Sequence, residues 1–264
     1  MDLSVSMTTE LVDRMSKVEA VQKSLPDAFD KLNACDEIAI LVFGGNEVAD
    51  ERTIGQTRDR DPYQGLRATP IRLLQPFTTD HQLALMRVAD RKAWGPAPLY
   101  DAIQQGLNML KSAHYQNRAL IVITDGIDTS SAIGKQDLIA TIKRSGAPVY
   151  AIELGEPNAP SFHHAPAVVI EPIPIPIKIG ESTLVDTGTL EKVTAPNGGQ
   201  LLIVPHATYD AGVTLKDELN STVAALNHGY AIGVVAAAGL ALPEITLANH
   251  RQMKVRAHII SGAQ

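Results

Sequence analysis

The sequence predicts an α/β fold, in which a doubly wound, mostly parallel sheet is flanked by helices and carries one antiparallel edge strand. Apolar runs of strand length alternate along the chain with amphipathic helical stripes. The runs at 37–43 and 119–124 are almost continuously apolar, which is typical of parallel strands covered on both faces. With 45% hydrophobic and 20% charged residues among 264, the composition is that of a globular protein and excludes a disordered chain.

The first predicted helix spans about 8–33. Pro26 lies inside its apolar stripe and should kink or restart the helix. Cys35 follows, before the strand at 37–43, and we interpret it as a small buried apolar residue. As the single cysteine, it excludes an intrachain disulfide. The stripe steps by three or four residues through Leu11, Met15, Val18, Val21, Leu25, Phe29 and Leu32.

The remaining elements complete a domain over 1–228 and an appended segment over 229–264. Within the domain, 156–178 is rich in proline, and its Ile-Pro alternation predicts a protruding loop or edge ribbon. The segment 229–264 is expected to add C-terminal strands at 230–235 and 253–260 that pack on or beside the domain. Between these ends we predict strands at 71–74, 119–124, 149–154 and 200–204, and helices at 79–91, 99–113, 136–144, 189–194 and 213–226.

Several classes of function are disfavoured. The net charge is −6, and no cluster of Lys and Arg exceeds a pair, which argues against nucleic-acid binding or an anionic membrane surface. No apolar run is long enough for a membrane span in this chain. The sequence has no phosphate-binding loop or serine-nucleophile turn. His163 and His164 lack a third ligand at helical or strand spacing, so a solvated loop pair is favoured over a metal site.

A possible metal site begins at the second residue. Asp2, Ser4 and Ser6 form a D-x-S-x-S pattern, which places a carboxylate and two hydroxyls at alternate positions of a tight loop. Such oxygens suit Mg²⁺ or Mn²⁺, whereas zinc would favour His or Cys. The alternative is that Ser4 or Ser6 only caps the following helix.

A second carboxylate, Asp125, directly follows the strand at 119–124. Ligands of open α/β sheets bind above the carboxyl ends of the strands. We therefore expect Asp125 to face the Asp2 loop across this edge, within reach of one shared ion. The alternative is a simple Asp-Gly turn at 125–126.

Together these segments resemble the von Willebrand factor type A (vWA) family. The similarity extends over 36–43, 95–103, 124–128 and 149–152. The sequence of these segments is most similar to bacterial VWFA-related proteins described from acidobacteria. The resemblance implies that Asp2, Ser4, Ser6 and Asp125 surround Mg²⁺ or Mn²⁺ in a metal-ion-dependent adhesion site. It also implies a non-enzymatic domain that binds a protein partner, whose Asp or Glu completes the ion's coordination. Because similar bacterial proteins are often exported, it favours a secreted or periplasmic location.

The chain departs from the family pattern at two places. Ala97 stands where the family has its metal-binding Thr, which implies a weaker or degenerate site. The family's central strand runs into the D-x-S-x-S loop, whereas only Met1 precedes Asp2 here. We expect the native protein to begin upstream, or else the sheet to be destabilised or rearranged, with open edges. Two alternative functions remain: a metal-dependent hydrolase or phosphatase, and a structural assembly module without metal.

Overall fold

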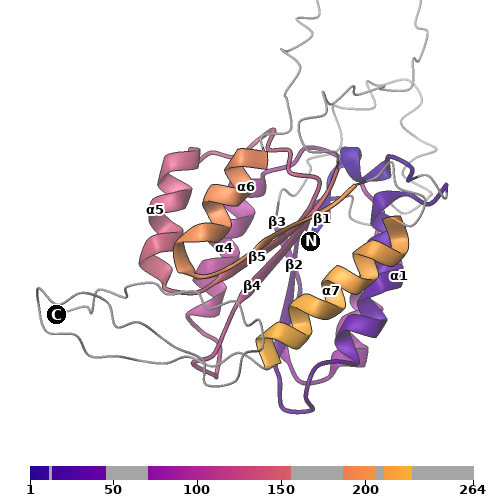
Figure 1. Cartoon of the computed structure of the whole chain (residues 1–264), viewed down its shortest axis with the longest axis horizontal. Helices are drawn as coiled ribbons and strands as arrows, with labels where there is room; N and C mark the ends of the chain where they lie inside the picture. The colour runs from indigo at the N-terminus through magenta and orange to yellow at the C-terminus, as the bar shows by residue number, and fades with distance from the viewer. Residues whose placement is uncertain (12–13, 46–70, 156–186, 206–210, 228–264) are drawn as a thin grey trace, which may run out of the picture.

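The computed structural model describes residues 1–11, 14–45, 71–155, 187–205 and 211–227, and it has the predicted α/β architecture (Figure 1). The order of its elements follows the sequence prediction closely from residue 71 onward. The elements are β1 (Asp2–Leu3), η1 (Val5–Thr8), α1 (Lys17–Phe29), β2 (Ile38–Gly44), β3 (Ile71–Thr78), α3 (His81–Val88), α4 (Leu99–Leu110), β4 (Leu120–Thr124), α5 (Lys135–Ser145), β5 (Val149–Leu154), α6 (Thr187–Thr194), η2 (Ala195–Asn197), β6 (Leu201–Val204) and α7 (Ala211–Asn227).

The prediction of one helix from residue 8 was wrong. Only the short η1 follows the Asp2 loop, and α1 begins nine residues after Thr8. Ser16 starts α1 with a capping box, in which its hydroxyl accepts from the Glu19 amide and the Glu19 carboxylate accepts from the Ser16 amide. Before it, Arg14 has φ 64°, which no helix tolerates, so the apolar stripe is interrupted there. Pro26 lies within α1 without ending it.

Cys35 also differs from its prediction, because it is exposed rather than buried. The helix ends at Phe29, earlier than the stripe indicated, and Cys35 lies in the surface turn between α1 and β2.

The strands form two three-stranded sheets, ordered β1-β2-β3 and β4-β5-β6. In the second sheet all pairs are parallel, with Leu120 opposite Val149 and Ala151 opposite Leu201. In the first, β1 is parallel to β2, whereas β3 is antiparallel and forms the edge, as predicted. Because β1 has two residues, its pairing with β2 covers only Asp2–Phe43 and Leu3–Gly44.

Helices cover both faces of the strands. In Figure 1, α1 and α7 lie on one side and α4, α5 and α6 on the other. The side chains of β4 and β5 alternate between the two cores, as expected for doubly covered strands. Ile123 and Ile152 belong to the core under α1 and α7, whereas Val122 and Ala151 belong to the core under α4, α5 and α6.

The junction between the two sheets is open at one end. A groove of about 480 Å³ runs between β2 and β4, walled by residues 38–41 of one strand and 120–123 of the other. Its remaining lining is mostly apolar and comes from helices on both sides, including Ala28, Met109 and Val223. The groove thus separates the two three-stranded sheets at this end.

Several predictions fall outside the described residues. They are the Pro-rich segment at 156–178, the pair His163 and His164, and the strands expected at 230–235 and 253–260. Within the described residues, no helix combines the length and apolar character that a membrane crossing requires.

Candidate functional site at the carboxyl ends of β1 and β4

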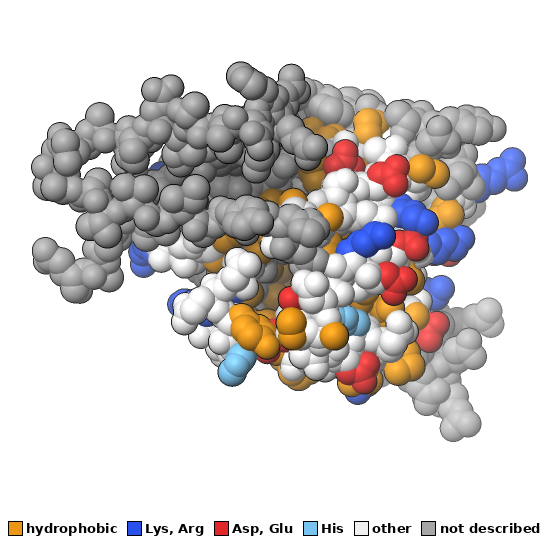
Figure 2. Space-filling view, turned by 60° about the horizontal axis from the view of Figure 1, so that its bottom comes forward, with side chains coloured by type: hydrophobic (Ala, Val, Ile, Leu, Met, Phe, Trp, Pro, Cys, Tyr) orange, Lys and Arg blue, Asp and Glu red, His pale blue; other side chains and the backbone are white. Residues whose placement is uncertain are grey.

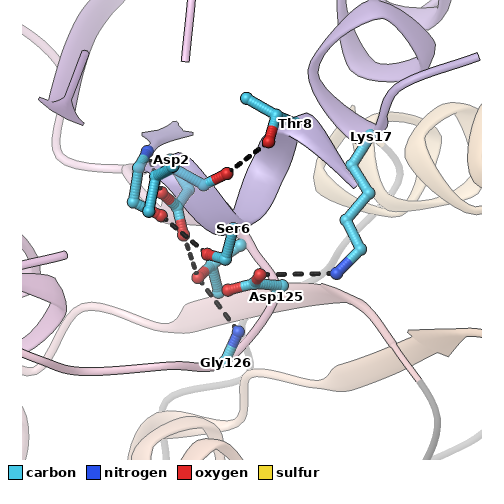
Figure 3. A network of polar contacts seen from close by, with 9 residues as sticks. Asp2, Ser6, Thr8, Lys17, Asp125 and Gly126 are labelled. Atoms are coloured by element: carbon cyan, nitrogen blue, oxygen red, sulfur yellow. Dashed lines mark hydrogen bonds and ion pairs between the residues drawn. The ribbon is translucent and has the colours of Figure 1, made fainter. Parts of the chain in front are cut away.

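The Asp2 loop and the end of β4 meet at one edge of the strands (Figure 3). A side-chain hydrogen bond joins them directly, because the Thr124 hydroxyl donates to Asp2 Oδ2 over 2.7 Å. Asp2 Oδ1 accepts from the Ser4 amide, also at 2.7 Å. Asp2, Ser4, Thr124 and Asp125 are all almost completely buried. The sequence-distant segments at 2–6 and 124–126 thus form one polar cluster.

The two serines present their hydroxyls to each other. Ser4 Oγ and Ser6 Oγ lie 3.0 Å apart and share a hydrogen bond. Ser4 stands at the N-cap of η1, but its side chain makes no capping hydrogen bond. The capping of α1 belongs to Ser16 instead. The alternative that Ser4 or Ser6 serves as a helix cap therefore has no support in the structure.

Asp125 lies next to Asp2, and its side chain points into the protein and not into solvent. Its side chain is 2% exposed, and its Oδ2 is 3.3 Å from the Lys17 ammonium. Its Oδ1 is buried and has no hydrogen-bond partner within the described part of the chain. A turn is present as well, since Gly126 has φ 82° and donates its amide to Thr124 Oγ1. The Asp-Gly turn thus coexists with a buried carboxylate that still has acceptor capacity.

Burial shapes the electrostatics of this cluster. Burial, followed by the neighbouring Asp125 charge, raises the pKa of the Asp2 carboxyl from 3.8 to about 7. Hydrogen bonds from Ser4 and Thr124 to the carboxylate oppose the rise. Two adjacent buried carboxylates therefore bind either a proton or a cation at neutral pH more readily than isolated ones would.

No protein-family model matches the chain, and no curated protein matches it. Among solved structures, a von Willebrand factor type A protein from Catenulispora acidiphila superposes with a TM-score of 0.54 at 16% identity, covering 85% of this chain and 41% of that one. The chain has the vWA fold. The acidobacterial likeness stays a prediction.

Two further structures agree with this vWA fold. The VWA domain of SpRpn10 gives a TM-score of 0.52 at 15% identity, with 89% of this chain and 95% of that chain covered. The pilus adhesin SpaC from Lactobacillus rhamnosus GG gives 0.53 at 12% identity, with 85% and 29% covered.

The residues at this polar edge are of the kinds that bind a hard divalent cation. Asp2, Ser4, Ser6 and Asp125 supply carboxylate and hydroxyl oxygens, which are the ligands that Mg²⁺ and Mn²⁺ prefer. Asp125 Oδ1, which has no partner among the described residues, is an acceptor that a cation or its bound water would satisfy. Asp2 accepts hydrogen bonds from the Ser4 amide and the Thr124 hydroxyl, and a carboxylate can accept up to about four such bonds.

Position 97 supplies no side-chain oxygen to this edge. Ala97 is buried, and its backbone pairs with Thr129 in both directions: its amide donates to Thr129 Oγ1, and its carbonyl accepts from the Thr129 amide. The Thr129 hydroxyl is therefore engaged with the backbone at 97 instead of replacing the missing threonine.

Two residues of the cluster were missed in the sequence. Thr124 ends the predicted strand at 119–124, and no role was predicted for its hydroxyl, which links β4 to Asp2. Lys17 was missed altogether. Its position four residues before Val21, a core residue of α1, is the signal that could have placed it on the buried face.

Proposed function

We propose that this vWA domain binds a protein partner without catalysing a reaction, through a divalent cation held at Asp2, Ser4, Ser6 and Asp125. Mg²⁺ is the favoured ion, with Mn²⁺ as its substitute. The observation that carries the proposal is the pairing of two buried carboxylates beside two hydroxyls, with Asp125 Oδ1 unpartnered among the described residues. The ion would supply a charge-assisted anchor for an Asp or Glu of the partner.

The surface supports a protein partner over a nucleic acid. Acidic and basic side chains are interspersed on the described part of the face in Figure 2. The net charge of −6 also disfavours contact with phosphate backbones. That one superposable structure is a pilus adhesin, and another a VWA domain, agrees with a binding role.

Hydrolysis is less well supported. A phosphatase of this layout would carry a second acidic residue just after the first, where this chain has Ser4 and Ser6. A metal-independent interaction module is the second candidate, and a specific contact favours it: the Lys17 ammonium already pairs with Asp125. Ala97, which offers no oxygen, points the same way.

Titration calorimetry with Mg²⁺ and Mn²⁺ distinguishes these candidates. We expect binding heat for the wild type and loss of that heat for Asp2→Asn. Asp90→Asn, which removes an exposed carboxylate that is not part of the polar cluster, should leave the heat unchanged. Asparagine keeps the size of the side chain and one acceptor oxygen, so it leaves the loop intact. Absence of heat from the wild type would favour the metal-independent module, and turnover of phosphate esters would favour the hydrolase.

A further inference from the structure

Lys17 is a buried basic residue at the first position of α1. Its side chain is 10% exposed, and its ammonium lies 3.3 Å from Asp125 Oδ2. Figure 3 shows the side chain reaching from α1 to the polar edge where Asp2, Ser6 and Asp125 gather. Lysine is almost never buried unless it is paired, so the pairing with Asp125 holds the ammonium in place.

The two carboxylates at this edge need positive charge or a proton beside them. Asp2 and Asp125 are 0% and 1% exposed, and two buried negative charges are costly unless positive charge accompanies them. Lys17 supplies one positive charge, on the side of Asp125. The ammonium therefore accompanies one of the two carboxylates, and Asp2 is left to take up either a proton or a cation.

We propose that Lys17 is the site's own counter-ion, which competes with the divalent cation for Asp125 and thereby sets the cation affinity of this domain. The inference rests on the proposed function, because it assumes that the ion binds beside Asp125. An ammonium and a divalent ion in the same small, buried space repel each other strongly, since little water screens them. Cation binding and the Lys17–Asp125 pair therefore exclude each other in part.

The geometry lets the ammonium leave while the helix stays. The Lys17 backbone amide donates to the Thr9 carbonyl at 3.0 Å, which fixes the start of α1 independently of the side chain. The side chain beyond it is a flexible four-carbon stem with a point charge. An ion pair of 3.3 Å is also longer than the closest charge-assisted hydrogen bonds. Exchange of the ammonium for a cation thus needs a side-chain movement only.

Calorimetric titration of the full chain with Mn²⁺, comparing wild type with Lys17→Met, tests the proposal. Methionine keeps the apolar stem and removes the charge, so the Lys17–Asp125 ion pair no longer competes with the ion. We therefore expect the variant to bind Mn²⁺ roughly tenfold more tightly than the wild type. Lys17→Arg keeps the charge and should stay close to the wild type. Lys23→Met removes a charge from the exposed side of the same helix and should also leave the affinity unchanged.

A second readout is the unfolding temperature. Without cation, Lys17→Met should unfold at a lower temperature than the wild type, because the carboxylate pair has lost its counter-ion. Mn²⁺ should then raise the unfolding temperature of Lys17→Met by more than it raises that of the wild type. Equal Mn²⁺ affinities for wild type and Lys17→Met, or weaker binding by the variant, would overturn the role of Lys17 while leaving the cation site standing. No binding by either protein would overturn the cation site itself.

Discussion

The junction between the two sheets has a polar end and an apolar end, and the two are built differently. At the polar end, the Thr124 hydroxyl on β4 donates to Asp2 on β1 and joins the sheets through side chains. At the apolar end, β2 and β4 stand apart across a groove of about 480 Å³. Helix α4 contacts both of these strands and spans the gap.

This difference shows where the domain has freedom to change. A backbone ladder fixes strands residue by residue, whereas a side-chain hydrogen bond and a shared helix fix them at a few points. In the described residues, β1 pairs with β2 but forms no ladder with β4. We therefore expect substitutions that face the groove to be tolerated better than those inside the second sheet.

The largest effect is expected at Gly199, in the turn that leads into β6 of the second sheet. A Cβ added there would lie 1.8 Å from the carbonyl oxygen of Val149 on β5, and a backbone atom cannot yield as a side-chain tip can. Gly199→Ala should lower the free energy of unfolding by about 3 kcal/mol or more, as severe steric clashes in packed regions do. Denaturant unfolding measures it, and a loss below about 1 kcal/mol would show that this region is no more closely packed than the groove.

The matched substitution beside the groove should have the smaller and opposite effect. A Cβ on Gly106, in the middle of α4, would meet only the tip of Leu120, at 2.8 Å, and Leu120 lines the groove and has room to move. Alanine is favoured over glycine within a helix by roughly 1 kcal/mol. Gly106→Ala should therefore stabilise the domain by up to that amount in the same unfolding assay, and a clear loss would mean that the groove is closed in solution.

At the polar end, the stability of the domain should depend on pH. Because burial raises the pKa of Asp2 from 3.8 to about 7, the folded protein holds a proton there that the unfolded chain has released. Without divalent cation, the contribution of Asp2 to stability is greatest below about pH 4, falls as the pH rises toward 7 and is constant above it.

Chelator-treated protein should therefore lose stability across this interval, and Asp2→Asn should lose less, since it has no proton to release. Thermal unfolding from pH 4 to pH 8 gives both curves. Parallel curves for the two proteins would contradict the raised pKa of Asp2.

Much of the fold was readable from the sequence because its signals are local. The strand at 149–154 was predicted with its observed bounds, since an apolar run that only Glu153 interrupts is flanked by Gly and Pro residues. The site's position followed from topology, because Asp125 ends a parallel strand and such ends share one edge of a sheet. Both features can be recognised in the sequence without knowing which distant residues are in contact.

The failures arose where two local signals competed. The apolar stripe through Leu11 and Met15 argued for a continuous helix, but the capping box of Ser16 and Glu19 starts α1 later, and both patterns are present in the sequence. The wrong prediction that Cys35 is buried followed from the same error, because the helix ends earlier than assumed. Lys17 could not be assigned a partner from sequence, because Asp125 is 108 residues away.

The central claim is that the Asp2 loop and Asp125 share one cation. Anomalous diffraction from crystals soaked in Mn²⁺ tests it most directly, because the Mn²⁺ signal locates the ion without reference to any variant. We predict one anomalous peak in coordination contact with oxygens of Asp2, Ser4 or Ser6, and beside Asp125, with the Lys17 ammonium moved away from Asp125. Saturating Mn²⁺ with no peak at this edge, and with Lys17 still paired to Asp125, would contradict the account.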